Sequence, residues 1–524
     1  MFLALVASTA LAGAAYPVEE RSAAQIAADL AAGRATSEAV TQAYLDRIAA
    51  LDAAGPSLHS VIAVNPKALE QARAVDAARK AGKKLGPLAG VPVLLKDNIE
   101  TADPVATTAG SLALKDNITG RDAPVAARLR AAGAILLGKT NLSEWANIRS
   151  SHSISGWSGV GGLVKNPYAL DRNTCGSSSG TGAAIAASLA AVGVGTETDG
   201  SITCPSSLNG LVGLKPTVGL VSRSRIVPIS HSQDTAGPMA RSVADAALLL
   251  TAMAGSDPAD SATAPADAKR GDYVAALSGA TLKGKRLGVL KYASELQADE
   301  DILFRQTVAK LKAAGAEIVE IADFHPAREV GEAEDLVLTT ELKADLNAYL
   351  ATTPATVKSR TLTDLIAFNR ADPRELGLFG QDYFEKADGA KGLDDPAYLK
   401  ARALSQKAMG PDGIDALIAR DHLDALIAPS YGPAWRTDIV GGDHDSGAVS
   451  SLAAVSGYPN LTVPMGQVRG LPVGMSFIGP AWSEARLLAL GAAFEALVQG
   501  RRAPTYAASV ETGPDAAALL APAR

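Results

Sequence analysis

Through the residues that follow the N-terminal segment, apolar positions recur three or four residues apart, and a glycine closes each run. The runs are residues 22–33, 37–55 and 68–82. Ser22 stands immediately before the first run, at the position of a helix N-cap, and glycine is the residue that most often follows a helix. The pattern predicts that residues 21–80 are mainly helical.

Short apolar runs and helical patterns then alternate. Residues 90–100 ("GVPVLLKDNIE") and 134–138 ("AILLG") are predicted as buried strands, and residues 124–133 as the helix between them. The small residues of 180–195 ("GTGAAIAASLAAVGVG") predict a closely packed alanine-rich helix. This alternation predicts an α/β fold, with a large parallel or mixed β-sheet covered by helices on both faces.

The same alternation returns in the second half of the chain. Residues 254–283 are rich in Asp, Ala, Gly and Pro, which predicts a loop. Strand patterns follow at 284–293, 422–430, 458–466 and 472–480, a helix and strand at 299–324, and a helix at 484–498. We therefore expect a single domain. Its predicted parts are residues 16–510 as a whole, a core at about 60–250, a later αβ excursion at about 284–410, and the completion of the sheet at about 420–500, followed by a loose tail at 511–524.

The N-terminal residues 1–15 have the pattern of a signal peptide. Residues 2–11 are apolar, and Ala12-Gly13-Ala14 resembles a cleavage site of small residues, although a positively charged start is missing. This predicts a periplasmic or secreted protein. The alternative is an apolar N-terminal arm on a cytoplasmic protein. No run is long enough to span a bilayer, so stable membrane association is not expected.

Composition narrows the choice of function. Of the 524 residues, 47% are hydrophobic and 20% charged, which is typical of a soluble globular protein. The formal net charge is −6 and no basic stripe is present, so nucleic acid is not an expected partner. The six histidines lack the spacing of metal ligands, and we predict neither a metal nor a cofactor.

The two cysteines, Cys175 and Cys204, flank one glycine- and serine-rich stretch. Two cysteines are too few for a disulfide framework or a zinc ribbon. We interpret them as small buried side chains rather than as a disulfide or a reactive pair. The pairing itself stays open at this stage.

Two short motifs match known patterns and are rejected on physical grounds. Residues 133–140 ("GAILLGKT") fit the phosphate-loop pattern, but their variable positions are apolar and the predicted order is helix, strand, turn. Residues 176–180 ("GSSSG") fit the nucleophile elbow and would make Ser178 the nucleophile. The preceding segment is a poor strand, and no glycine-rich oxyanion motif is present.

A lysine offers a base for amide hydrolysis without histidine. Such a reaction needs a nucleophile, a base that also protonates the leaving amine, and donors for the oxyanion. Lys96 follows an apolar strand that carries it into the interior, where burial lowers a lysine pKa from ~10.4 towards ~7–8. Taken alone, Lys96 would be read as a strand-end lysine that reaches water.

Several separate motifs change that interpretation, because together they resemble the amidase signature family. They are "GVPVLLKDNI", "GKTNLSEWA", "NPY", "CGSSSGTG", "GTETDGSITCP" and "NGLVGLKPTVGLVS". They cover about residues 60–250, and the resemblance returns near 424–500. Ser177 and Ser201 lie 24 residues apart, which also fits that family.

The resemblance implies a Ser-cisSer-Lys triad. Lys96 matches the base, Ser177 the relaying serine after a cis peptide bond, and Ser201 the nucleophile. The backbone N–H groups of the turn match the family's oxyanion hole; its residues are Thr198, Asp199, Gly200 and Ser201.

Three further residues are expected to support the site. Ser178 is expected to support Lys96 or Ser177, and Ser179 to cap the following helix. Asp234 is expected to hold a loop near the site.

Departures from the family pattern point to a substrate. The serine run reads Cys-Gly-Ser-Ser-Ser-Gly, and Thr203 stands where many members have arginine. This combination is more similar to bacterial peptide amidases, which remove the C-terminal amide of peptide amides, than to the amidotransferase subunit of Gln-tRNA formation. Residues expected near the substrate are Ser151, Trp157, Tyr431 and Trp435, although each tryptophan fits a core position equally well.

We therefore expect a small-molecule or peptide amide substrate, and a monomer or simple homo-oligomer. The alternatives within the family are a general aliphatic or aryl amidase, an esterase, or an amidotransferase-type subunit. Outside enzymes, the alternative is a binding protein that keeps the fold. The presence of Lys96, Ser177 and Ser201 together argues against that alternative.

Overall fold

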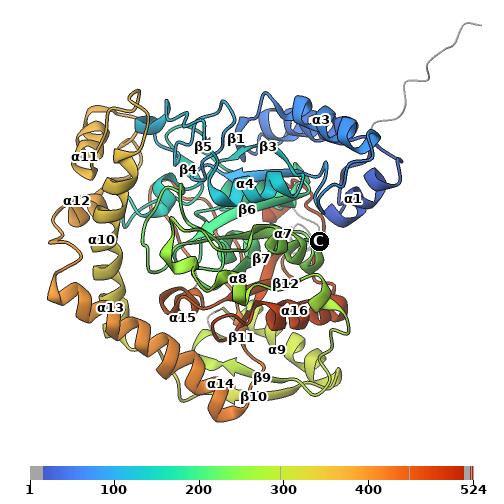
Figure 1. Cartoon of the computed structure of the whole chain (residues 1–524). Helices are drawn as coiled ribbons and strands as arrows, with labels where there is room; N and C mark the ends of the chain where they lie inside the picture. Colours follow the sequence, from blue (N-terminus) through green and yellow to red (C-terminus); the bar gives the residue numbers. More distant parts are fainter. Residues whose placement is uncertain are drawn as a thin grey trace, which may run out of the picture.

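An 11-stranded mixed β-sheet runs through the computed structural model of the chain (Figure 1). The structure describes residues 16–294, 297–445, 447, 449–512, 520 and 522. The predicted signal segment 1–15 and most of the predicted tail lie outside the described residues. The strands of this sheet are β1 (Val61–Val64), β2 (Pro92–Lys96), β3 (Ile135–Thr140), β6 (Val192–Glu197), β7 (Val212–Lys215), β8 (Thr235–Ala240), β9 (Arg286–Leu290), β10 (Glu317–Ile321), β11 (Ala425–Pro429), β12 (Asn460–Val468) and β13 (Leu471–Ile478). A separate small sheet pairs β4 (Trp157–Ser158) with β5 (Gly162–Leu163).

The strand order is β1-β3-β2-β6-β8-β7-β12-β13-β11-β9-β10. β2 pairs in parallel with β3 and β6, and β9 pairs in parallel with β10 and β11, whereas the other pairs are antiparallel. The predicted large mixed sheet is therefore confirmed, and its far end is built from the strands of the second half of the chain.

Helices connect and cover the strands. They are α1 (Ala23–Ala31), α2 (Ser37–Ile48), α3 (Ala68–Lys80), α4 (Pro124–Ala131), α5 (Ser179–Ala186), α6 (Thr203–Leu208), α7 (Val243–Met253), α8 (Ala266–Lys269), α9 (Ala298–Ala313), α10 (Arg328–Ala351), α11 (Leu362–Ala371), α12 (Asp382–Asp388), α13 (Pro396–Met409), α14 (Ala416–Asp421), α15 (Ser450–Ser456) and α16 (Glu484–Val498). Within the described residues, no helix has the length and apolar character needed to cross a membrane.

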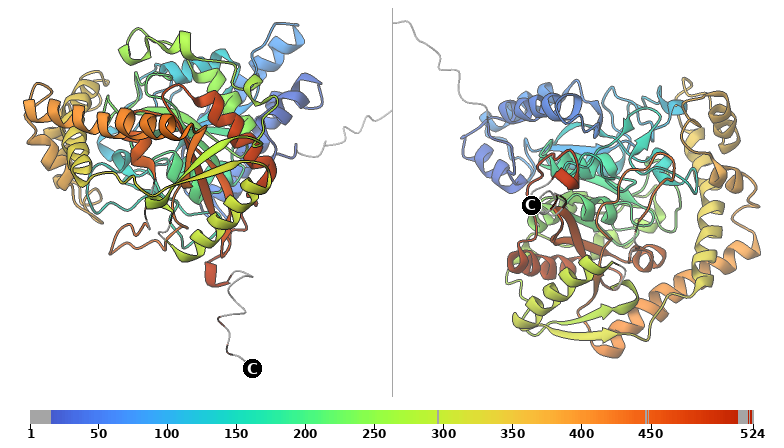
Figure 2. Two further views of the ribbon diagram at one scale, coloured as in Figure 1. Left: turned by 90° about the horizontal axis from the view of Figure 1, so that it is seen from below. Right: turned by 180° about the vertical axis from the view of Figure 1, so that it is seen from behind.

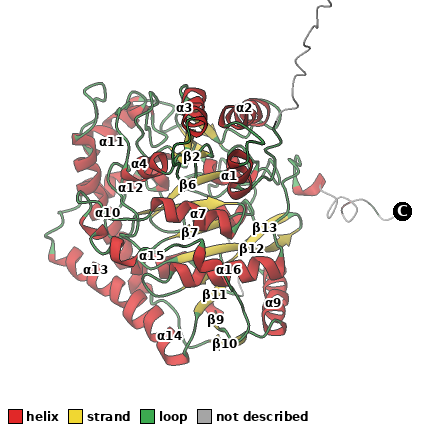
Figure 3. Ribbon diagram, turned by 45° about the vertical axis from the view of Figure 1, so that its right-hand side comes forward, coloured by secondary structure: helices red, strands yellow, loops and turns green. Residues whose placement is uncertain are grey.

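Helices cover both faces of the sheet, as predicted, and the alternating directions of side chains along β12 show this. Leu461 and Val463 lie against Gly491 of α16, on the side where α7 also packs (Figure 3). Thr462, one residue between them, points to the other face, where Gly474 of β13 lies beside it and against Ser207 of α6. Because successive strand residues face opposite sides, α16 and α6 lie on opposite faces.

Helices α10 to α13 form a flank at one side of the sheet (Figures 1 and 2). α10 packs along α13 and against α12. Buried contacts join the middle of α10 to the loop that precedes β8, so this flank reaches the centre of the molecule.

The N-terminal helices form as predicted, but the short strand β1 within this segment was missed. The side chain of Ser22 accepts a hydrogen bond from the Gln25 N–H and caps α1. β7 and β8, in the middle of the sheet, were also missed. β1 pairs antiparallel with β3 at the edge of the sheet. Its four residues are too few to show a strand period within a segment dominated by helical spacing.

The predicted alanine-rich helix over 180–195 is wrong in its extent. α5 ends at Ala186, and the chain turns back into β6 from Val192. Gly193 and Gly195 of β6 lie directly against Thr181 and Ser178 at the start of α5, where a Cβ atom would overlap those side chains. The glycines that looked like part of a helix therefore allow the strand to lie against it.

The rejected phosphate-loop motif is a buried strand. Residues 135–140 form β3, and every residue of this strand is buried. These residues therefore do not form a phosphate loop.

Candidate active site

β2 carries Lys96 into the interior, as its apolar sequence predicts. All five residues of the strand are buried, and the Lys96 side chain is fully buried. Lys96 Nζ forms hydrogen bonds with Ser177 Oγ at 2.6 Å, with Thr196 Oγ1 at 2.9 Å and with the Thr196 carbonyl at 3.2 Å. In its neutral form the amine donates to the two Thr196 oxygens and accepts from the Ser177 hydroxyl. Burial lowers the pKa of Lys96 to about 7, so a large share of the amine is neutral near neutral pH.

Ser177 stands at the end of a tight turn just before α5. The Gly176–Ser177 peptide bond is cis, as the resemblance predicts. The Ser177 carbonyl accepts a hydrogen bond from the Ser143 N–H, and the Ser177 side chain is fully buried. Its hydroxyl therefore faces Lys96 and no solvent.

Thr196 was not singled out from the sequence, yet it holds the lysine in place. β6 runs parallel to β2 and pairs Val194 with Leu95, which puts Thr196 beside Lys96. Asn98 also donates to Thr196 Oγ1 at 2.9 Å. No signal in the sequence pointed to this role, because the residues just before Thr196 were predicted as a helix. Only the pairing of β6 with β2 reveals it.

Ser178 is also hydrogen-bonded to Thr196. Its hydroxyl donates to the Thr196 carbonyl at 3.1 Å and accepts from the Thr196 N–H at 3.2 Å. Ser178 is fully buried and supports Lys96 through Thr196. Because the Ser178 hydroxyl is already hydrogen-bonded to Thr196, the nucleophile-elbow interpretation is disfavoured.

Ser179 does not cap α5 as expected. It is the first residue of the helix, and its hydroxyl lies 3.2 Å from Ser143 Oγ.

The turn from Thr198 to Ser201 lies beside the serine run. The Ser178 N–H donates to the Ser201 carbonyl at 3.2 Å, which ties the two segments together. Among the described residues, Ser201 Oγ meets no hydrogen-bond partner, and neither do the N–H groups of Asp199, Gly200 and Ser201. The turn therefore presents a free hydroxyl and free amide donors in one place.

Side chains around the turn fix its shape. The buried carboxylate of Glu197 accepts from the N–H groups of Ile202 and Thr203 at 2.7 and 2.9 Å. Thr198 Oγ1 donates to Asp234 at 2.5 Å, and Ser451 Oγ donates to Asp199 at 2.5 Å. The backbone amides are therefore held in place before any ligand binds.

Gly200 is required at its position. Its φ of +78° favours glycine, and a Cβ atom there would lie 1.9 Å from the Tyr431 hydroxyl. Tyr431 is held by Ser450 at 2.8 Å. Of the four predicted substrate-binding residues, Tyr431 thus lies at the turn.

The other three predicted substrate-binding residues have different neighbours. Trp157 belongs to a small hydrophobic cluster, where its ring meets Phe379 edge to face at 5.3 Å. The Trp435 side chain packs against the main core, and its carbonyl accepts from the Asn173 N–H. Ser151 is exposed and binds Asp382 through its N–H. The alternative core interpretation therefore describes both tryptophans better.

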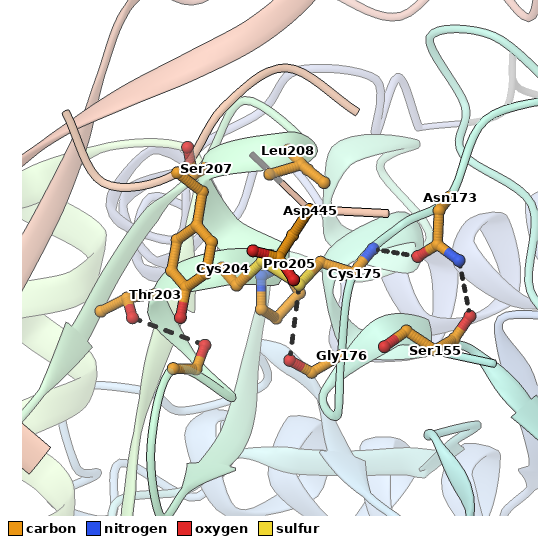
Figure 4. The surroundings of a disulfide bond; sticks show 12 residues. Ser155, Asn173, Cys175, Gly176, Thr203, Cys204, Pro205, Ser207, Leu208 and Asp445 are labelled. Atoms are coloured by element: carbon orange, nitrogen blue, oxygen red, sulfur yellow. Dashed lines mark hydrogen bonds between the residues drawn. A yellow bond between two sulfur atoms is a disulfide. The ribbon is translucent and has the colours of Figure 1, made fainter. Parts of the chain in front are cut away.

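Cys175 and Cys204 form a disulfide, so the interpretation of two unpaired buried thiols was wrong (Figure 4). The bond joins the residue before Gly176 to the helix that follows Ser201. Asn173 holds the first half-cystine through the Cys175 N–H and also donates to the Ser155 carbonyl. Their separation of 29 residues gave no signal, because only the fold brings the two segments into contact.

A pocket of about 510 Å³ opens beside Thr196, the residue that binds Lys96. Thr196, Thr198 and Asp234 line it on the side of the site, and residues 226–229 and Ala348 of α10 provide apolar walls. Its lining contains none of the four predicted substrate-binding residues.

One group of side chains in the described part of the chain has metal-ligand types within reach of one another: His231, Glu341 and Asp345. Their acceptor atoms already have partners. Tyr398 donates to Glu341 at 2.6 Å, and His231 lies 2.9 Å from Asp345. We interpret the group as a link between α10 and the loop before β8.

The comparisons with known proteins agree with this geometry. A family model described as Amidase matches residues 39–488. The chain belongs to the amidase signature family. A curated relative from Arabidopsis thaliana named "Probable amidase" is 41% identical over 485 residues, which is 91% of this chain and 89% of the relative.

Two solved structures show how similar this amidase-signature chain is to peptide amidases. The native peptide amidase from Stenotrophomonas maltophilia is 51% identical, with a TM-score of 0.89 over 94% of this chain and 99% of that one. A peptide amidase in complex with the competitive inhibitor chymostatin is 52% identical, with a TM-score of 0.90 over 94% and 100%. The chain is an amide-hydrolysing enzyme of this family.

Removal of the disulfide is expected to destabilise the enzyme. For two cysteines 29 residues apart, the lost constraint on the unfolded chain corresponds to about 3–4 kcal/mol of unfolding free energy. Chemical denaturation of the wild type and of Cys175→Ser/Cys204→Ser would measure the difference, with a thiol assay to verify the oxidised state. Equal denaturation midpoints for the two proteins would contradict a stabilising role.

Proposed function

We propose that this amidase hydrolyses the C-terminal carboxamide of peptide amides through Lys96, Ser177 and Ser201. The observation that carries the proposal is the buried amine of Lys96, 2.6 Å from Ser177 Oγ. Beside this pair, Ser201 has a free hydroxyl on a turn with free amide donors.

The proposed reaction begins with a relay of protons. Neutral Lys96 accepts the proton of Ser177 Oγ, and Ser177 accepts the proton of Ser201 Oγ as this oxygen attacks the carboxamide carbon. The free N–H groups of the turn stabilise the negative charge on the carbonyl oxygen. The protons then return along the same path to the departing nitrogen, and the C–N bond breaks to release ammonia.

Hydrolysis of the acyl-enzyme completes the cycle. Water attacks the ester carbon of acylated Ser201, and its proton passes through Ser177 to Lys96. The C–O bond to Ser201 breaks and releases the peptide acid, and the serine recovers its proton.

The proposed substrate class is supported by similarity and by space. The chain resembles a peptide amidase over nearly its whole length. The pocket beside Thr198, lined by both apolar and charged side chains, has room for an organic substrate larger than a simple amide. The alternative is a general amidase or esterase. An amidotransferase-type subunit is a further alternative, since a glutamyl-tRNA(Gln) amidotransferase subunit from Salinispora arenicola is 36% identical over 91% of this chain.

The disulfide supports a proposed location outside the reducing cytoplasm. Disulfides form and persist in oxidising compartments, and the apolar segment 1–15 fits export. Fractionation of expressing bacterial cells should place the oxidised enzyme in the periplasm or medium. Recovery of the bulk of the protein in the cytoplasm with free thiols would contradict export.

A panel of substrates tests the proposed activity. We expect mass spectrometry to show conversion of peptide amides to peptide acids, with kcat/KM higher than for simple aliphatic or aryl amides and esters. Conversion of small amides alone would favour the general amidase. Glutamine-dependent transfer to a charged tRNA would favour the amidotransferase-type subunit.

Covalent trapping tests the nucleophile. An acyl phosphonate should label the wild type and Ser178→Ala, but not Ser201→Ala, because only Ser201 has a free hydroxyl at the turn. Peptide mapping of the adduct identifies the labelled residue. A label on Ser178, or labelling that survives in Ser201→Ala, would contradict the proposed role of Ser201.

A further inference from the structure

We propose that Asp234 is a positioning residue of this reaction: its buried carboxylate joins the loop before β8 to Thr198 and so holds the oxyanion turn in place. The inference rests on the proposed function of Lys96 and Ser201. From the sequence, Asp234 was expected only to hold a loop. Here it has two separable effects on catalysis.

The sheet places Asp234 opposite the turn. β8 pairs antiparallel with β6, and Thr235, the first residue of β8, lies opposite Glu197, the last residue of β6. The residues just beyond this pair are therefore neighbours. They are Asp234 and Thr198, and Thr198 Oγ1 donates to Asp234 Oδ1 at 2.5 Å.

The other oxygen of the carboxylate is bound to its own loop. Asp234 Oδ2 accepts from the Ile229 N–H at 2.8 Å and from the Ser230 N–H at 3.0 Å. The Asp234 carboxylate therefore links three backbone segments: the turn, the start of β8 and the loop before it. Because Thr198 directly precedes the free amide donors, the hydrogen bond to its hydroxyl sets where those donors point.

Contacts with α10 immobilise the same loop. Ser232 donates to the buried Glu341 through its N–H at 3.1 Å and its hydroxyl at 2.8 Å. His231 binds Asp345 through both its N–H and its ring. The loop is therefore a rigid support, and Asp234 transmits that rigidity to Thr198.

The charge of Asp234 acts on Lys96. Across the described residues, Asp234 forms no ion pair within contact distance, so its charge is not neutralised by a direct partner. The charged groups that act on Lys96 are Asp234 and, more weakly, Glu197 of β6, and both raise its pKa against the effect of burial. A higher pKa makes the neutral amine a stronger base.

Further charged groups in the described part of the chain act on Asp234 and Glu197. Asp345 of α10 opposes ionisation of Asp234, and the charge of Arg223 interacts with Asp234. The positive charge of Lys215, by contrast, favours ionisation of Glu197 and acts to lower the Glu197 pKa against burial. Burial raises the pKa of Asp234 to about 6, so its carboxyl is largely ionised in the range where Lys96 becomes neutral.

The decisive experiment is the pH profile of kcat/KM for the wild type and Asp234→Asn. Asparagine preserves the geometry, because its carbonyl accepts from Ile229 and Ser230 while its amide faces Thr198 Oγ1. In the wild type, activity should rise with pH through about 7 as Lys96 loses its proton. In the variant, removal of the negative charge lowers the Lys96 pKa, so the rise should move about one unit towards acid.

A matched control removes a different buried carboxylate. Asp245 of α7 is buried and accepts from the N–H groups of Ala23 and Ala24, and it is not among the charges acting on Lys96. Asp245→Asn should leave the acid limb unchanged. A shift of equal size in both variants would overturn the proposed charge effect.

A second pair of variants isolates the hydrogen bond. Thr198→Val removes the hydroxyl, and at alkaline pH, where the Asp234 carboxyl is ionised in both proteins, kcat should fall about tenfold or more. Thr198→Ser should restore kcat, because it keeps the donor. Unchanged kcat in Thr198→Val would overturn the positioning role, and this pair decides that role even if Asp234→Asn does not fold.

The outcomes separate this inference from the proposed function. A wild type that hydrolyses amides without an acid limb contradicts Lys96 as the base. A wild type with the limb, together with an Asp234→Asn variant whose limb does not move, contradicts only the charge effect of Asp234.

Discussion

The burial of one lysine is the constraint on which the rest of the site depends. An amine taken out of water disfavours its charged form, and in Lys96 this effect outweighs the attraction of two nearby carboxylates. Every group that contacts the amine is an uncharged oxygen, from Ser177 or Thr196. The neighbourhood therefore solvates a neutral amine well and gives the proton no anionic partner in direct contact.

The sheet supplies the geometry that this lysine needs. β2, β6 and β8 are neighbouring strands inside the sheet. Their pairing brings Lys96, Thr196 and Asp234 to the same end of these strands, although the three residues are far apart in sequence. The parallel pair β2–β6 sets the distance of the lysine from Thr196, and the antiparallel pair β6–β8 brings the loop support to the turn. The strand order is thus directly responsible for the arrangement of the site.

The segment from Cys175 to Cys204 is closed on itself around the two serines. The disulfide joins its ends, α5 and β6 form its middle, and glycines at 193 and 195 allow helix and strand to lie together. A hydrogen bond from Ser178 to Ser201 then ties the serine run to the turn. Several independent contacts hold this segment, which limits the freedom of both serines before a substrate binds.

The sequence alone determined the α/β class and those helices and strands whose apolar spacing lies within consecutive residues, among them α1 to α4, β2, β3 and β11 to β13. Short motifs pointed to the three residues of the proposed triad. The sequence misjudged features that depend on distant segments. The helix expected over 180–195 contains a strand, and the two cysteines are bonded. Thr196 and the linkage through Asp234 emerge only from strand pairing, because hydrogen bonds between neighbouring strands leave no periodic trace in either strand's own sequence.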